Sequence, residues 1–238
     1  MKSQRGGDQS FVSLSDLMTG LMMIFLFVAV AFMLQVRAEQ AQKDEIIEDF
    51  STLKLELYEE LRAEFEQDFR PERWNAILGK DLSIRFVNDQ VHFDFDKAEL
   101  KSEFAAILDS FFPRYLGILL KQKYRRGVAE VRIEGHTDSV GAYMYNIHLS
   151  QARAAKVLHH LLFAPHSAVP NLLPEDQAQV RFWLSSTGYA SARTLDRNGD
   201  YTLEAKGRED EPKSRRVEFR VVTTADDVFE ILSEKVRR

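Results

Sequence analysis

The most prominent pattern in the chain is an uninterrupted apolar segment near the N-terminus. Residues 17–36 carry no charge and consist mainly of Leu, Met, Phe, Val and Ala. A transmembrane helix needs ~20 largely apolar residues, and a buried core helix would show a polar face that is missing here. The pattern therefore predicts a membrane-spanning helix over 16–36 after a short tail over 1–15. A cleaved secretory signal is the main alternative, but its apolar core is usually only ~7–15 residues long.

The basic residues around this segment predict its orientation. Lys2 and Arg5 precede the span, whereas Arg37 and Lys43 follow it among many acidic residues. Positive residues favour the cytoplasmic side of a membrane. We therefore expect a single-pass protein of the bacterial inner membrane with a cytoplasmic N-terminus, so that most of the chain lies in the periplasm.

An acidic segment with a helical hydrophobic period follows, and we assign residues 37–79 to a connector. Residues 37–70 contain eleven acidic and five basic residues, and no Gly or Pro occurs over 38–70. One apolar residue recurs every three or four positions, which is typical of one helix face. Such a narrow stripe favours packing against a second copy or against the following domain. A solvated spacer is the alternative, and we expect dimerisation. The stripe consists of Ile46, Phe50, Leu53, Leu57, Leu61 and Phe65.

The C-terminal segment, residues 80–238, alternates between strand and helix patterns. Period-two alternation predicts strands over 82–86, 91–95, 131–135, 180–184 and 217–221. Helical patterns cover 98–120 and 149–163, with Ser150 as a candidate N-cap for the second helix. Helices packed on one face of a mixed sheet give an α+β domain of βαβαββ order.

Composition narrows the possible functions. The chain has 45% hydrophobic residues, a net charge of −5 and no cysteine. The negative charge disfavours direct nucleic-acid binding, and the lack of cysteine excludes disulfides, thiolate metal sites and a cysteine nucleophile. The sequence shows no other nucleophile constellation, so we expect a protein that is not an enzyme and needs no cofactor.

Two groups of residues resemble metal sites but lack the full set of ligands. The histidines at 136, 148, 159 and 160 lack a third ligand at suitable spacing, so we expect no metal site there. Asp196, Asn198 and Asp200 alternate like the start of a calcium loop. In that pattern Gly199 comes too early and Glu204 occupies position nine rather than twelve. We interpret this segment as a turn with capping acids.

The string GHTDSVGAYMYNIHLSQARAAKVLHHLL over 135–162 resembles the peptidoglycan-binding domain of the OmpA, Pal and MotB superfamily. VHFDFDKAEL over 91–100 resembles the opening strand of that domain, and residues 215–218 resemble its closing strand. The resemblance covers about two thirds of the chain, but a charged insertion over 190–212 departs from it. The matching positions are Gly135, Thr137, Asp138, Gly141, Tyr145, Asn146, Leu149, Ser150, Arg153, Ala154 and Val157.

The resemblance implies a peptidoglycan-binding site. Diaminopimelate in the stem peptide carries an amine and a carboxylate, which can pair with an Asp and an Arg respectively. By resemblance, Asp138 and Arg153 fill these roles, and a purely structural salt bridge between them is the alternative. The other implied site residues are Thr137, Tyr145, Asn146 and Leu149.

A second resemblance concerns the start of the apolar segment. SDLMTGLMMIFLFV resembles the stretch that opens the transmembrane helix of MotB-type stator subunits. It implies that Asp16, with Thr19 in the same motif, binds a translocated H⁺ or Na⁺. A carboxylate at this depth is costly, and such groups tend to be functional. The alternative is an interfacial helix cap, with Ser13 and Ser15 assisting Asp16.

Together these features resemble an ion-driven stator, and the short tail and compact length resemble the membrane subunits of Zorya anti-phage defence systems. That resemblance implies a MotA-like multi-span partner, with five copies around two copies of this chain. A flagellar MotB-like stator remains an alternative, as does a passive membrane-tethered anchor.

Overall fold

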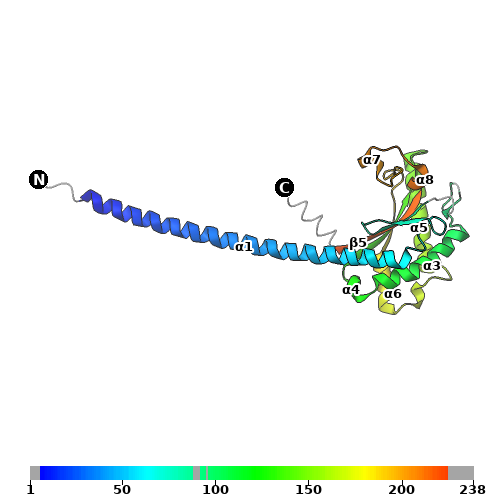
Figure 1. Cartoon of the computed structure of the whole chain (residues 1–238), viewed down its shortest axis with the longest axis horizontal. Coiled ribbons are helices and arrows are strands. Elements are labelled where there is room, and N and C mark those ends of the chain that lie inside the picture. Colours follow the sequence, from blue (N-terminus) through cyan, green and yellow to red (C-terminus); the bar gives the residue numbers. More distant parts are fainter. Residues whose placement is uncertain (1–5, 88–91, 95, 225–238) are drawn as a thin grey trace. The chain divides into compact units, whose positions relative to one another are not determined.

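The computed structural model describes residues 6–87, 92–94 and 96–224 (Figure 1). The chain divides into two compact units, Met1–Asp49 and Phe50–Arg238. One helix, α1 (Gly6–Phe65), contributes residues to both units. The expected continuous helix through the apolar segment and most of the connector is therefore confirmed, and it ends shortly before Pro71.

The apolar part of α1 has the properties of a membrane span. Leu17–Ala41 is long and apolar enough to cross a bilayer, somewhat longer than the expected 16–36. Its large apolar side chains between Leu17 and Leu34 are exposed. Exposed apolar side chains on a helix of this length are suited to contact with lipid. Asp16 lies within α1, but its side chain is outside the described part of the chain.

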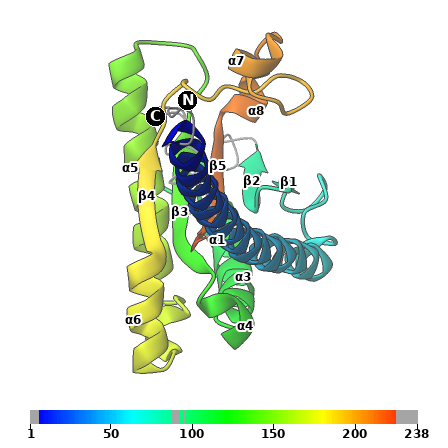
Figure 2. The same ribbon diagram turned by 90° about the vertical axis from the view of Figure 1, so that its left-hand side faces the viewer.

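The second unit is built on a five-stranded sheet of order β1-β2-β5-β3-β4 (Figure 2). Neighbouring strands are antiparallel except β3 and β4, which are parallel. The strands are β1 (Ala76–Leu78), β2 (Ser83–Val87), β3 (Val128–His136), β4 (Leu184–Gly188) and β5 (Arg216–Thr223).

The longer helices cover one face of this sheet, and the expected α+β class is confirmed. The long helix α5 packs against β3 and β4, and α3 lies beside α5. The helices are α3 (Ser102–Leu119), α4 (Gln122–Arg125), α5 (Tyr143–Phe163), α6 (Pro174–Trp183), α7 (Thr202–Ala205) and α8 (Glu211–Ser214), with a 3₁₀ turn at Val169–Asn171.

The hydrophobic core lies between the sheet and the helices. Phe86 of β2 and Phe219 of β5 pack edge-on against Phe111 of α3. The C-terminal turns of α1 complete this core, because Leu57, Leu61 and Phe65 are buried within it. These three positions pack against the following domain, the alternative that the sequence left open, and are not available to a second copy. The compact unit accordingly starts at Phe50, inside the predicted connector.

One predicted strand is wrong. Of the strand expected over 180–184, residues 180–183 form the last turn of α6, and β4 begins only at Leu184. Pro174 at the first helical position, followed by Glu175 and Asp176, favours a helix start. Val180 and Trp183 are both buried, and their spacing of three places them on one helix face.

Two further predictions need correction. Helix α5 begins at Tyr143 rather than 149, so Ser150 is an interior residue and not an N-cap. Of the strand expected over 91–95, residues 91 and 95 lie outside the described residues, and Phe93 forms an isolated bridge with Leu100. The predicted strands at 131–135 and 217–221 are confirmed as parts of β3 and β5, and the one at 82–86 is confirmed as β2, which is displaced by one residue to Ser83–Val87.

Candidate functional site

Two glycines allow α5 to approach the sheet very closely. A Cβ at Gly135 would lie 2.2 Å from the Ser150 carbonyl oxygen, and one at Gly188 would lie 2.3 Å from the Gln151 nitrogen. Such contacts are impossible, so only glycine permits this packing. The close approach brings the first half of α5 beside the C-terminal ends of β3 and β4, where the site lies.

The loop after β3 is fixed by hydrogen bonds to its own chain. Asn146 donates from Nδ2 to the carbonyl oxygens of Val140 (2.9 Å) and Asp138 (3.4 Å). The Thr137 hydroxyl donates to the Asp138 carbonyl at 3.0 Å. The amide of Val140 donates to Asp138 Oδ1 at 3.1 Å. These bonds hold the Asp138 carboxylate at the rim of a pocket.

The second oxygen of Asp138 faces a basic residue from the opposite wall. Arg215, which follows α8, donates from Nη1 to Asp138 Oδ2 at 2.6 Å. Glu211 of α8 lies 3.8 Å from the same Nη1. Asp138 is therefore charge-compensated before any ligand binds.

Arg153 enters the pocket from α5. Its Nε donates to the Lys97 carbonyl at 3.0 Å, and its guanidinium lies over the Phe93 ring at 4.8 Å. Only 4% of Arg153 is exposed, so its orientation is tightly restricted. Burial, and secondarily the Arg153 charge, lowers the pKa of neighbouring His92 to about 3.

These groups line a cavity of about 730 Å³, and all six peptidoglycan-binding candidates from the sequence meet there. The Tyr145 hydroxyl donates a hydrogen bond to Asp96 at this cavity, and that hydrogen bond raises the pKa of Tyr145. The lining comprises the predicted Thr137, Asp138, Tyr145, Asn146, Leu149 and Arg153, together with Phe93, Asp96, Lys101, Val140, Gly141, Glu211 and Arg215.

The sequence motifs do not predict the contribution of Glu211 and Arg215 to the pocket. The resemblance places Arg215 only in the closing strand, although its side chain lines the pocket from the position before β5. Side chains of adjacent residues in an extended segment point to opposite sides. The adjacent basic residues at 215 and 216 therefore indicate in the sequence that the two side chains have different surroundings. One of them reaches Asp138, whereas Arg216 is buried on the sheet.

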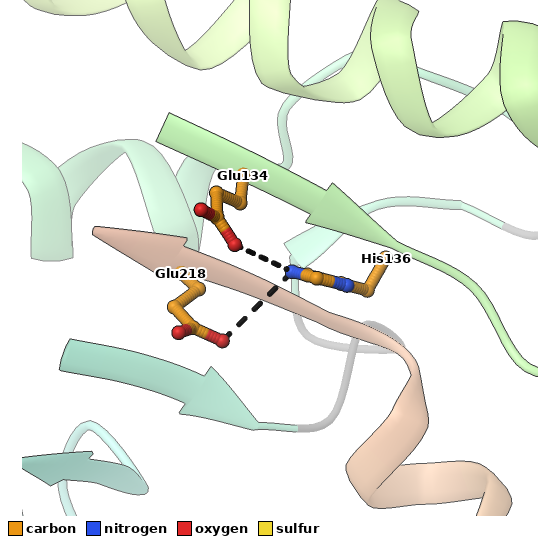
Figure 3. Close-up of side chains that lie close together, drawn as sticks. All are labelled: Glu134, His136 and Glu218. Atoms are coloured by element: carbon orange, nitrogen blue, oxygen red, sulfur yellow. Dashed lines mark ion pairs between the residues drawn. The ribbon is translucent and has the colours of Figure 1, made fainter. Parts of the chain in front are cut away.

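A second cluster of ionisable residues lies on the other face of the sheet, away from α3 and α5. Figure 3 shows Glu134, His136 and Glu218, whose ligand atoms lie within 4.8 Å of one another. His136 Nε2 is 3.3 Å from Glu134 and 3.8 Å from Glu218. Burial lowers the pKa of His136 well below its usual value, so the imidazole is neutral.

Arginine side chains make this cluster unsuitable for a cation. Arg216 Nε lies 3.1 Å from Glu218 Oε2, and Arg193 Nη1 lies 3.2 Å from Glu134 Oε2. Arg220 contacts both carboxylates. The oxygens that a metal ion would need already face guanidinium groups, and the positive charge of those groups would repel the ion. The cluster is a buried ion-pair network.

His160 and the calcium-like segment make structural contacts. His160 Nε2 lies 2.8 Å from Asp109 Oδ1. Asp196 Oδ1 accepts hydrogen bonds from the amides of Asn198 (2.8 Å) and Asp200 (3.0 Å). This geometry confirms the predicted turn with a capping acid.

Comparison with known proteins decides the family. The OmpA family model matches residues 92–208. The Zorya protein ZorB of Escherichia coli strain Crooks is 38% identical over 228 residues, which cover 92% of this chain and 90% of the relative. This chain belongs to the ZorB family. A second ZorB, from Escherichia coli O139:H28, is 29% identical and is covered over 79% of its length.

Other similar proteins match smaller parts of this ZorB-family chain. Outer membrane protein P5 of Haemophilus influenzae is 30% identical over 56% of this chain and 30% of its own length. A crystal structure of a MotB-like protein from Desulfovibrio vulgaris aligns with a TM-score of 0.45 and 23% identity, over 73% of this chain and 93% of that one. The periplasmic domain of Helicobacter pylori MotB aligns with a TM-score of 0.40 and 18% identity, over 63% of this chain and 82% of that one.

The family assignment confirms several expectations from the sequence. The chain is a ZorB-type protein with an OmpA-like domain, and it is not an enzyme. Its single candidate span among the described residues fits a single-pass protein of the inner membrane.

Proposed function

We propose that this ZorB-family chain is the wall-anchored membrane subunit of an ion-driven stator that acts in Zorya anti-phage defence. The observation that supports the wall-binding part is the single pocket in which all six candidate residues meet. Arg153 and Asp138 are both buried at this pocket, so it presents an oriented cation and an oriented anion.

The pocket chemistry suits the diaminopimelate of a peptidoglycan stem peptide. Its lining contains three acidic and three basic side chains, so a zwitterion fits better than a ligand of one charge. The ligand ammonium pairs with Asp138, and the adjacent carboxylate binds the guanidinium of Arg153. Phe93 and Leu149 contact the aliphatic part of the ligand.

For the membrane segment we propose that Asp16 binds the translocated H⁺ or Na⁺, with Thr19 beside it in the motif. Support comes from the family assignment and from the exposed apolar span that follows Asp16. An elementary charge that crosses the membrane gains about 2.3 kcal/mol per 100 mV, which is the energy source of the motor. The N-terminus is cytoplasmic and the pocket is periplasmic.

The proposed assembly has two copies of this chain inside five copies of a MotA-like partner. Because Leu57, Leu61 and Phe65 are buried in the domain core, the dimer contact must involve other residues. Flagellar motility and passive anchoring remain the competing functions. Sedimentation of the full chain with isolated peptidoglycan tests wall binding, and phage restriction by an Asp16→Asn variant tests the ion-carrying role.

A further inference from the structure

The charged insertion forms a cover over the second face of the sheet. We define the cap segment as residues 189–214, which follow β4 and include α7 and α8. At its start, the Tyr189 ring stacks on His136 with centroids 5.4 Å apart. Farther along, Arg85 of β2 donates to the Gly199 carbonyl at 3.3 Å. The cap segment is therefore attached to β2 and β3, on the face that carries the ion-pair network.

Hydrogen bonds within the cap segment make it a rigid unit. The amide of Leu195 donates to Ser214 Oγ at 3.0 Å, and Asp210 donates to the Leu195 carbonyl at 2.8 Å. A backbone bridge joins Asp196 to Glu209. The position of Glu209 is thus fixed by contacts that run back to the sheet.

From this fixed position, Glu209 reaches the ligand loop. Its Oε1 accepts a hydrogen bond from the Ser139 amide at 3.2 Å, and its Oε2 accepts one from the Ser139 hydroxyl at 2.5 Å. Ser139 lies between Asp138, the proposed ammonium partner, and Val140, whose amide donates to Asp138 Oδ1. One carboxylate of the insertion therefore holds the residue next to the binding carboxylate.

We propose that Glu209 is a positioning residue for peptidoglycan binding, acting through Ser139 on Asp138. The proposal rests on the proposed wall-binding function of the pocket. Hydrogen bonds to a carboxylate are stronger than hydrogen bonds between neutral groups. The two bonds from Ser139 to Glu209 therefore restrict the loop, which includes Gly141 at φ +93°. A loop ordered before binding loses less conformational entropy when the ligand arrives.

The experiment compares variants of the full chain in detergent for binding to isolated peptidoglycan. We expect Glu209→Ala to weaken binding roughly 3- to 10-fold, because it removes one or two exposed charge-assisted hydrogen bonds. Glu209→Gln keeps one acceptor oxygen and should fall between Glu209→Ala and the wild type. Glu204→Ala removes an exposed carboxylate from the same cap segment, so it is the matched control and should bind like the wild type.

Two additional measurements separate positioning from general stability. Hydrogen exchange of the peptide spanning 137–141 should accelerate in Glu209→Ala while the unfolding midpoint changes little. Combining Ser139→Ala with Glu209→Ala should weaken binding no further than Glu209→Ala alone, because both changes remove the same contact.

The failure of this proposal differs from the failure of the wall-binding function. If Asp138→Asn abolishes binding but Glu209→Ala binds and exchanges like the wild type, the positioning role is wrong and the site stands. If the wild-type chain does not bind peptidoglycan, both are wrong. Equal losses in Glu204→Ala and Glu209→Ala would also overturn the proposal, because they would indicate a general effect of charge.

Discussion

Arg215 Nη1 lies 2.6 Å from Oδ2 of Asp138, so the carboxylate proposed to bind an ammonium group already has a cationic partner. The two side chains are 22% and 12% exposed. An ion pair of this kind orients the carboxylate and lowers the cost of its partial burial. A ligand ammonium therefore has to share Asp138 with Arg215 or displace it.

We predict that Arg215→Ala weakens peptidoglycan binding about 10-fold. The change leaves Asp138 without its guanidinium partner and removes one of the three basic groups in the pocket, a loss of roughly 1.4 kcal/mol of binding free energy. Arg215→Lys should retain part of the affinity, because it keeps the charge but not the planar geometry. Tighter binding by Arg215→Ala would instead show that Arg215 competes with the ligand.

A second prediction concerns the end of α1. Leu61 is fully buried in the domain core, so Leu61→Ala should lower the free energy of unfolding by about 2–4 kcal/mol. Leu55 on the same helix is 61% exposed, and Leu55→Ala should change stability by less than about 0.5 kcal/mol. Denaturant unfolding of both variants checks the difference. Equal stabilities would mean that these turns of α1 do not belong to the domain.

The third prediction follows from His92, whose pKa is lowered from 6.5 to about 3 by burial. The folded protein keeps this imidazole neutral, whereas the unfolded chain takes up a proton below pH 6.5. Stability should therefore fall as pH decreases from 6.5 toward 3, by about 2–3 kcal/mol over the first two pH units. His136 acts in the same direction.

Replacing the titrating group isolates its contribution. The His92 ring lies 4.0 Å from the Phe104 ring, so His92→Phe suits the apolar surroundings. Unfolding free energies measured at pH 6.5 and 4.5 should differ less in His92→Phe than in the wild type. An unchanged difference would show that His92 is protonated in the folded state or does not contribute.

The sequence predicts which residues line the pocket better than it predicts the bounds of the surrounding helices and strands. Asp138 and Arg153 lie fifteen positions apart in the motif, and both line the same pocket. Gly135 of that motif allows the close approach of α5 to β3. The strand expected over 180–184 failed, since alternation over four or five residues also fits one turn of a buried helix end. The contact between Glu209 and Ser139 joins residues seventy positions apart, and no local pattern in a single sequence carries that information.

A fourth prediction tests the ion-carrying role of Asp16. Asp16→Asn removes the negative charge with little change in size, so ion-driven function should be lost while membrane insertion and peptidoglycan binding persist. Asp16→Glu keeps the carboxylate and should retain part of the function. Phage restriction in cells that express the chain with its native partners is the measurement. Full restriction by Asp16→Asn would reduce the protein to a passive anchor.

Binding of the full-length chain to isolated peptidoglycan tests the central claim most directly. The wild type should sediment with the polymer, and free diaminopimelate should release it. Asp138→Asn and Arg153→Ala should each weaken binding at least about 10-fold, since each removes one charged contact from the ligand. Undiminished sedimentation of both variants, or a wild type that stays in the supernatant, would contradict the account.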